Sequence, residues 1–195
     1  MSNFEFLSVL FAIIIGIGFA HLLLSIGRIL GEAKSLNIGS VQVIWTVNVL
    51  LTLVTYWWWL INLRTIEEWA YLELLLLLFH ASLLVLLAAM LFPVTIPLGY
   101  DLKAHFETKR TSFFGILVLI AFADPLAAMI VGTQHLFDLG WQYLHFIVVC
   151  FVGGIAGIRF RNERFQQVLA VYWGFSLINV ALFSGIVLDL YTATP

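Results

Sequence analysis

The sequence predicts an all-α bundle of six transmembrane helices in a single domain, 1–195, and three observations predict it. Hydrophobic residues make up 63% of the 195 positions and charged residues 10%, a balance typical of polytopic membrane proteins. The apolar residues gather into six runs of about 20 residues or more, the length that crosses the ~30 Å hydrocarbon core of a bilayer. Lys and Arg lie almost entirely in alternate loops between these runs.

The first three helices are predicted at about residues 4–30, 41–63 and 69–92. The first carries small residues at four-residue spacing, which is typical of close helix contacts: Ser8, Ala12, Gly16 and Ala20. The second ends in the aromatic run 56–59, as helices do at a membrane interface. The third ends at Pro93, because proline has no backbone N–H to continue a helix.

The last three helices are predicted at about residues 112–132, 139–158 and 166–191. The fifth carries Gly153 and Gly157 in a G-x-x-x-G spacing, which permits close helix association. We expect a homo-oligomer associated through this face; the alternative is that the face packs within one chain. Between the third and fourth helices, Leu98, Leu102 and Phe106 recur every four residues. This spacing predicts a separate amphipathic segment at about 99–109, lying on the membrane surface.

The distribution of basic residues predicts the orientation in the membrane. Cytoplasmic loops are enriched in Lys and Arg. Loops 1–2, 3–4 and 5–6 hold eight of the nine basic residues: Arg28, Lys34, Lys103, Lys109, Arg110, Arg159, Arg161 and Arg164. Both termini are therefore expected outside, with these three loops in the cytoplasm.

A faint internal repeat accompanies this topology. The segment 82–85, SLLV in the third helix, is similar to 176–179, SLIN in the sixth. Three helices in each half give the halves inverted topology, as in many transporters. The sequence thus favours, weakly, a 3+3 inverted repeat.

Composition and motifs exclude several classes of function. A net charge of −2 gives no bulk attraction to nucleic acid, so no nucleic-acid partner is expected. The single Cys150 cannot build a disulfide framework or a thiolate metal cluster, and no metal site is predicted. Metalloprotease, serine-hydrolase and Walker motifs do not occur in the sequence. An enzyme is therefore less expected than a transport or structural protein.

Polar residues inside the predicted helices are the candidate functional residues, since a carboxylate at the bilayer centre costs roughly 2.5 to 3.5 kcal/mol on insertion scales. Counted along the helices, they fall into three layers: His80, Asp124 and Asn179 near the midplane, His21 and Asn48 in the cytoplasmic third, and Glu73 and His145 in the outer third. Together they predict a polar path for a proton or cation. The alternative is that each is satisfied locally and serves packing, which is favoured for the two asparagines.

Asp124 carries the sharpest expectation. It is followed by Pro125 and flanked by the small residues Ala121 and Ala128, which allow its face to pack on a neighbouring helix. We expect Asp124 and His80 to face one interior space and to share a proton, because a nearby imidazolium would stabilise a buried carboxylate.

Three functions remain open at this point. A proton or cation channel, or an ion-coupled small-solute transporter, accounts for the polar residues within the membrane. A structural or sensory subunit accounts for the small size and the absence of motifs. Electron transfer with haem or quinone is the third; no cofactor is predicted, but haem stays open. Haem ligation by His21 and His80 is disfavoured by their ~9 Å difference in depth.

The sequence also resembles a known group of proteins. The resemblance lies in Phe4-Glu5-Phe6-Leu7-Ser8-Val9-Leu10, Gly16-x-Gly18-x-x-His21, Gly27-Arg28, Trp45-x-x-Asn48 and Trp57-Trp58. These motifs are similar to those of small uncharacterised bacterial inner-membrane proteins with six helices, over roughly the first three helices. The resemblance implies a multi-pass protein of the bacterial inner membrane, and it implies no activity.

Overall fold

The computed structural model describes residues 3–32, 36–66, 68–97, 99–131 and 140–193. These residues form α1 (Asn3–Glu32), α2 (Ser40–Trp59), the short 3-10 helix η1 (Leu60–Thr65), α3 (Tyr71–Leu91), α4 (Leu102–Val131), α6 (Gly140–Arg159) and α7 (Glu163–Ala193). Within the described ranges, six helices are long and apolar enough to span a membrane. The predicted all-α bundle is confirmed, and the chain is an integral membrane protein.

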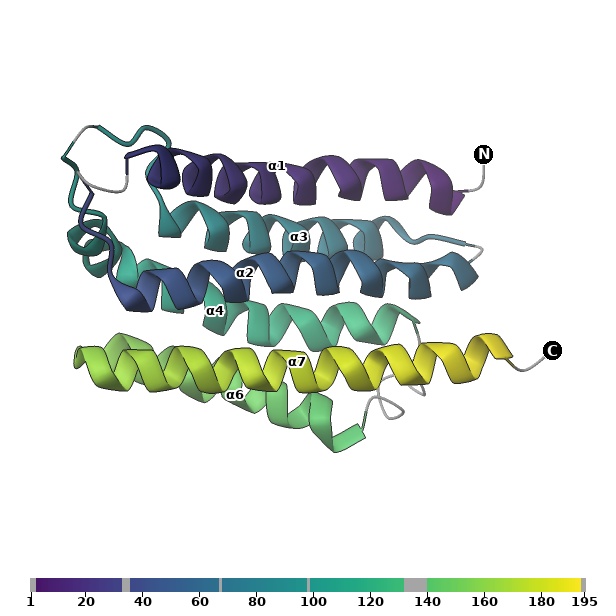
Figure 1. Ribbon diagram of the computed structural model, residues 1–195. Helices are drawn as coiled ribbons and strands as arrows, with labels where there is room; N and C mark the ends of the chain where they lie inside the picture. The colour runs from purple at the N-terminus through teal and green to yellow at the C-terminus, as the bar shows by residue number, and fades with distance from the viewer. Residues whose placement is uncertain (1–2, 33–35, 67, 98, 132–139, 194–195) are drawn as a thin grey trace.

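The helices pack in two layers. α1, α3, α4 and α6 follow one another in a row, and α2 and α7 lie side by side against that row (Figure 1). The first turn of α1 and the last turn of α7 lie at the same end of the bundle (Figure 1). In a 3+3 repeat, α1 of the first half corresponds to α4 of the second half. α1 packs chiefly on α3, whereas α4 packs on both α3 and α6. The inverted repeat therefore stays a prediction that this pairing does not support.

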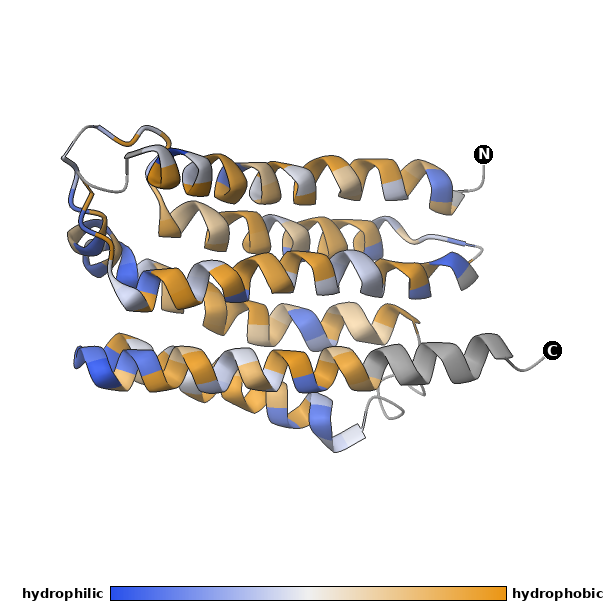
Figure 2. Cartoon of the chain, viewed as in Figure 1, coloured by the Kyte–Doolittle hydropathy of each residue, from blue (hydrophilic) through white to orange (hydrophobic). Residues whose placement is uncertain are grey.

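Apolar side chains cover the outside of the bundle as well as its core. Figure 2 shows hydrophobic colour along the helices and hydrophilic colour where α4 and α7 begin. Large apolar residues such as Ile13 on α1, Phe122 on α4 and Phe175 on α7 are exposed. Apolar surface of this extent is compatible with lipid rather than water around the helices.

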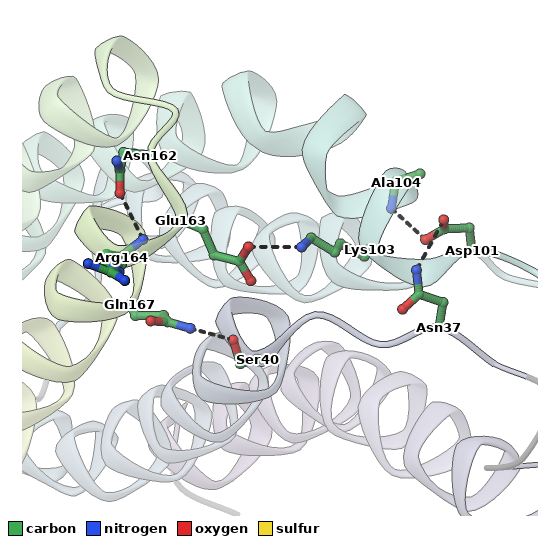
Figure 3. Close-up of polar contacts among 9 residues, drawn as sticks. All are labelled: Asn37, Ser40, Asp101, Lys103, Ala104, Asn162, Glu163, Arg164 and Gln167. Carbon is green, nitrogen blue, oxygen red and sulfur yellow. Dashed lines mark hydrogen bonds and ion pairs between the residues drawn. The ribbon is translucent and has the colours of Figure 1, made fainter.

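Polar side chains cap the helices at the end of the bundle that carries most of the basic residues. Asp101 Oδ1 accepts a hydrogen bond from the N–H of Ala104 at 2.9 Å, and Asn162 Oδ1 accepts one from Arg164 at 2.9 Å (Figure 3). These bonds satisfy backbone donors that the first turn of a helix leaves free. The caps explain why α4 and α7 begin at these points in the sequence.

The separate surface segment expected at 99–109 is wrong. Residues from Leu102 onward form the first turns of α4, which continues without interruption through Pro125 to Val131. No Gly or Pro stands between 102 and 114 to stop the helix, and the buried Arg110 and Phe106 attach this part of α4 to the bundle. The segment is amphipathic, but its apolar residues Leu102 and Phe106 pack against the bundle instead of the membrane surface.

The glycines of α6 serve packing within the chain. A Cβ on Gly157 would lie 2.5 Å from the ring of Phe114, and one on Gly154 would lie 2.6 Å from Val118. Both contacts are with α4, and Gly153 faces Leu169 of α7. The face expected to form a homo-oligomer is thus occupied by the chain's own helices. Oligomerisation stays a prediction without this surface to support it.

Candidate functional site

Asp124, His80 and Tyr143 form a polar cluster inside the membrane-spanning part of the bundle. His80 Nε2 lies 3.4 Å from Asp124 Oδ1, and the Tyr143 hydroxyl donates a hydrogen bond of 2.7 Å to Asp124 Oδ2. The three side chains come from α3, α4 and α6, which are neighbours in the same row of helices. The expected juxtaposition of Asp124 and His80 is confirmed.

Packing fixes the imidazole of His80. Its side chain is 2% exposed, and the ring of Tyr56 meets it edge to face, with centroids 4.8 Å apart. Tyr56 is anchored in turn by a hydrogen bond of 3.3 Å from its hydroxyl to the carbonyl of Leu77. His80 Nδ1 has no hydrogen-bond partner among the described residues. A buried nitrogen without a partner costs stability.

Asp124 is more accessible than His80. Its side chain is 27% exposed, and small neighbours on α4, Ala121, Ala127 and Ala128, are buried beside it. A carboxylate in this position is stabilised by the Tyr143 hydroxyl and, when the imidazole is protonated, by His80. The cluster therefore places an imidazole and a phenol on the two different oxygens of one carboxylate.

A cavity of about 80 Å³ adjoins the cluster. His80, Asp124, Tyr143, Thr52 and Thr55 contribute polar groups to its walls, and leucine, isoleucine and aromatic side chains contribute the remainder. At roughly 30 Å³ per water molecule in the liquid, this space holds about two or three waters. The walls give such waters hydrogen-bond partners on four helices, α2, α3, α4 and α6.

Aromatic rings separate this cavity from the start of α4. The Trp45 ring lies 5.0 Å from Phe113, 5.5 Å from Phe114 and 5.3 Å from Trp173, between ring centroids. Trp45, Phe113, Phe114 and Trp173, here called the aromatic plug, are each at most 1% exposed. Phe114 lies ten residues before Asp124, about 15 Å along the helix. The plug closes the bundle between the cavity and the basic end.

Two other predicted residues connect helices or cap them. Asn48 is buried and donates a hydrogen bond of 2.8 Å to the carbonyl of Ala170 on α7, and its amide fills the space beside Gly174. Glu73 Oε2 accepts a hydrogen bond of 3.0 Å from Ala70 N at the start of α3. Both contacts satisfy the polar side chain within the protein and stabilise the fold. For Asn48 this is the role in helix packing that the sequence favours over a role in a polar path.

The remaining three predicted residues lie away from the cluster. His145 faces the bundle surface, where its Nε2 lies 2.8 Å from the hydroxyl of Tyr172. Asn179 is exposed on α7, so the helix does not direct it into the interior. His21 lies beside the backbone of Phe92, just beyond the end of α3. The structure thus brings together two of the seven candidates and does not join the layers into one path.

The sequence did not identify Tyr143 and Tyr56 as part of the site. Tyr143 is not singled out by the sequence, and Tyr56 is placed with Trp57 to Trp59 in the aromatic run at the membrane interface. A tyrosine near a helix end carries the same signal in both settings, because its ring is apolar and its hydroxyl needs a partner. Trp57 and Trp58 are exposed as the interface interpretation requires, whereas Tyr56 points inward.

The described residues contain no group of three or more His, Cys, Asp or Glu side chains placed to hold a metal ion. Comparison with protein-family models, with curated proteins and with solved structures finds no match for this chain. The functional argument therefore depends on the chemistry of the site itself.

Proposed function

We propose that this integral membrane protein moves protons across the bilayer, as a channel or as part of an ion-coupled transporter. The observation that carries the proposal is the contact of one carboxylate with both an imidazole and a phenol inside a membrane-spanning bundle. Ionisable groups at this depth are costly and typically mark proton or ion pathways. Histidine and carboxylate together exchange a proton readily near neutral pH.

The size of the cavity favours a proton over a larger solute. About 80 Å³ accommodates a few waters, whereas sites for organic ligands have volumes of roughly 300 to 1,000 Å³. Waters held between His80, Asp124 and the hydroxyl of Thr55 would extend the hydrogen-bonded chain beyond the three side chains. Thr52, which also lines the cavity, donates its proton to the carbonyl of Asn48 and leaves its oxygen free to accept.

The aromatic plug supports a gated route. Trp45 and Trp173 lie between the cavity and the basic end of the bundle, where α2, α4 and α7 begin. A proton that reaches Asp124 from the end of the bundle that carries the termini can continue to the basic end only when these rings separate. Gating of this kind would keep the protein from short-circuiting a proton gradient.

The membrane and orientation belong to the same proposal. The alternate loops that hold most of the Lys and Arg residues face the cytoplasm by the positive-inside rule. The resemblance in the first three helices supports the bacterial inner membrane. The cluster of Asp124, His80 and Tyr143 then lies in the half of the bundle nearer the outside, since Tyr143 is three residues from the start of α6.

Proton flux into proteoliposomes tests the proposal. Purified protein is reconstituted with a pH-sensitive dye trapped inside, and a pH step or potassium-diffusion potential is applied. Vesicles that contain the protein should acidify several-fold faster than empty vesicles. Equal rates under both driving forces would favour the structural or sensory subunit instead.

A second candidate, quinone binding, is favoured by one observation. A groove of about 280 Å³ between α2 and α7 shares Thr55, Trp59 and Leu177 with the central cavity. An apolar tail could lie in this groove while a polar head reached the cluster. Organic extraction of the purified protein, followed by an absorption spectrum, tests for quinone. The same spectrum before extraction would reveal haem by its Soret band.

A further inference from the structure

Asn179 lies on the outside of α7 at the depth of the central cavity. Leu177 and Val180, its near neighbours in the sequence, line that cavity together with Asp124, whereas Asn179 itself is exposed. It also lies near the middle of a helix of 31 residues, which is longer than the ~20 residues that cross the hydrocarbon core. In a single copy of the chain, the amide of Asn179 therefore faces lipid.

The amide of Asn179 forms no hydrogen bond with the part of the chain that the structure describes. Other exposed polar groups on the membrane-spanning helices are satisfied within the chain. The Ser82 hydroxyl donates to the carbonyl of Leu78 at 2.7 Å, and the Tyr172 hydroxyl lies 2.8 Å from His145 Nε2. Lipid tails offer no hydrogen bond, so an unpaired amide among them costs free energy. Asn179 therefore requires a partner from outside the chain.

An exposed seam runs along α7 through Asn179. Its members follow one another at alternating steps of four and three residues: Val168, Tyr172, Phe175, Asn179 and Leu182. The four members other than Asn179 are between 49% and 68% exposed, and Val171 and Ile178 are exposed beside them. This heptad spacing is the one at which two helices pack in a left-handed pair, with Asn179 at an a position and Phe175 and Leu182 at d positions. These five residues, here called the α7 seam, thus have the pattern of a helix interface without a helix against it in the chain.

We propose that the α7 seam is the interface between two copies of this chain. Two copies insert into the membrane in the same orientation, so the two-fold axis that relates them runs along the membrane normal and α7 packs parallel to its counterpart. Each residue on such an axis meets itself. An amide carries both N–H donors and an acceptor oxygen, so Asn179 can donate to the same amide of the second copy and accept from it. A single asparagine at an a position also specifies a parallel pair and its register.

This interface leaves the proton route of each copy intact. The residues of α7 that line the central cavity, among them Trp173 and Leu177, lie on its buried face, whereas the α7 seam lies on its exposed face. Each copy keeps its own cluster of Asp124, His80 and Tyr143, so the dimer contains two separate clusters. The interface can therefore be tested without measuring proton flux.

Disulfide cross-linking of the full chain in native membranes tests the surface. The variant is Phe175→Cys in the α7 seam, and its matched control is Phe122→Cys on α4. Both side chains are exposed, at 68% and 58%, and the native Cys150 is buried. A disulfide requires Cα atoms within about 7 Å of each other, and residues at d positions of a parallel pair face each other across the axis. Mild oxidation should therefore convert Phe175→Cys mainly to a covalent dimer and leave Phe122→Cys mainly monomeric.

The role of the amide is tested by Asn179→Leu, with Asn179→Gln as the variant that keeps an amide and Ser82→Ala as the control on another face. Förster transfer between donor- and acceptor-labelled copies in liposomes, measured as the lipid-to-protein ratio is raised, gives the dissociation constant of the dimer. Asn179→Leu should weaken association about 3- to 30-fold, as expected for loss of one polar contact between membrane helices. Asn179→Gln should restore most of the affinity, and Ser82→Ala should leave it within about twofold.

Three results would overturn the proposal. The first is a wild-type protein that stays monomeric at every lipid-to-protein ratio. The second is Phe175→Cys that cross-links no more than Phe122→Cys, or that cross-links to a different protein. The third is Asn179→Leu that associates as tightly as wild type.

Discussion

The hydroxyl of Tyr143 donates a hydrogen bond of 2.7 Å to one oxygen of Asp124, and the other oxygen lies 3.4 Å from His80. The phenol thus occupies one side of the carboxylate and leaves the other side to the imidazole. Tyr143 is partly buried on α6 and would hold Asp124 in the orientation that brings it to His80.

Replacing Tyr143 by Phe should lower proton flux several-fold and alter its dependence on pH. The substitution removes only the hydroxyl, so the carboxylate loses a donor worth roughly 1.5 to 3 kcal/mol when it is ionised. Dye-loaded proteoliposomes measure the flux between pH 5 and 8. The matched control is Tyr172→Phe, which removes a hydroxyl bound to His145 at the bundle surface. Equal effects of the two changes would contradict the role of Tyr143.

Substituting Gly157 by Ala should destabilise the fold. The added Cβ would lie 2.5 Å from the ring of Phe114, and overpacking of this kind costs roughly 1 to 3 kcal/mol. Gly16 of α1 has no atom within 4 Å of the same position, so Gly16→Ala should be neutral or slightly stabilising. Thermal unfolding in detergent compares the two. A midpoint for Gly157→Ala equal to that of wild type would show that α4 and α6 do not pack as described.

Most of this fold can be predicted from the sequence, because long apolar runs identify transmembrane helices. Six apolar runs gave six helices, and Asp124 was correctly placed with His80 because lipid leaves a carboxylate few other positions. What could not be predicted depends on which helices become neighbours. Asn179 was expected inside and lies outside, since one asparagine does not fix the rotation of an apolar helix. Arg110 was counted only as a loop charge, yet it closes the end of α6.

Stability near the start of α4 should depend on acid pH. The hydrogen bonds that Asp101 accepts from Ala104 N–H and the Asn37 side chain hold the pKa of this carboxyl below its usual range. Because the pKa is lowered in the folded state, the ionised group stabilises the fold above its ordinary pKa, and this contribution is lost as the pH falls through the lowered value.

Asp101→Asn isolates that contribution, since asparagine also caps helices but does not ionise. Wild type should be the more stable at neutral pH, and its advantage should shrink as the pH falls below about 5. Unfolding midpoints of both proteins from pH 3 to pH 7 give the difference. A difference that stays constant over this range would contradict the assignment.

Cysteine labelling can establish the orientation in the membrane. The native Cys150 is buried and should remain silent to a membrane-impermeant maleimide. A cysteine at the exposed Tyr71 should be labelled in intact spheroplasts, and one at the exposed Arg164 only after the membrane is permeabilised. The reverse pattern would place the basic loops outside.

The central claim is that Asp124 takes part in proton movement by gaining and losing a proton. Asp124→Asn keeps the shape of the side chain and a carbonyl oxygen to accept from Tyr143, but it removes the titration. The most direct test is proton flux through proteoliposomes across the pH range, with wild type and Asp124→Asn reconstituted at equal protein density after both are shown to have the same helical content. The account predicts that Asp124→Asn falls to the rate of empty vesicles at every pH. Flux equal to that of wild type across the range would contradict it.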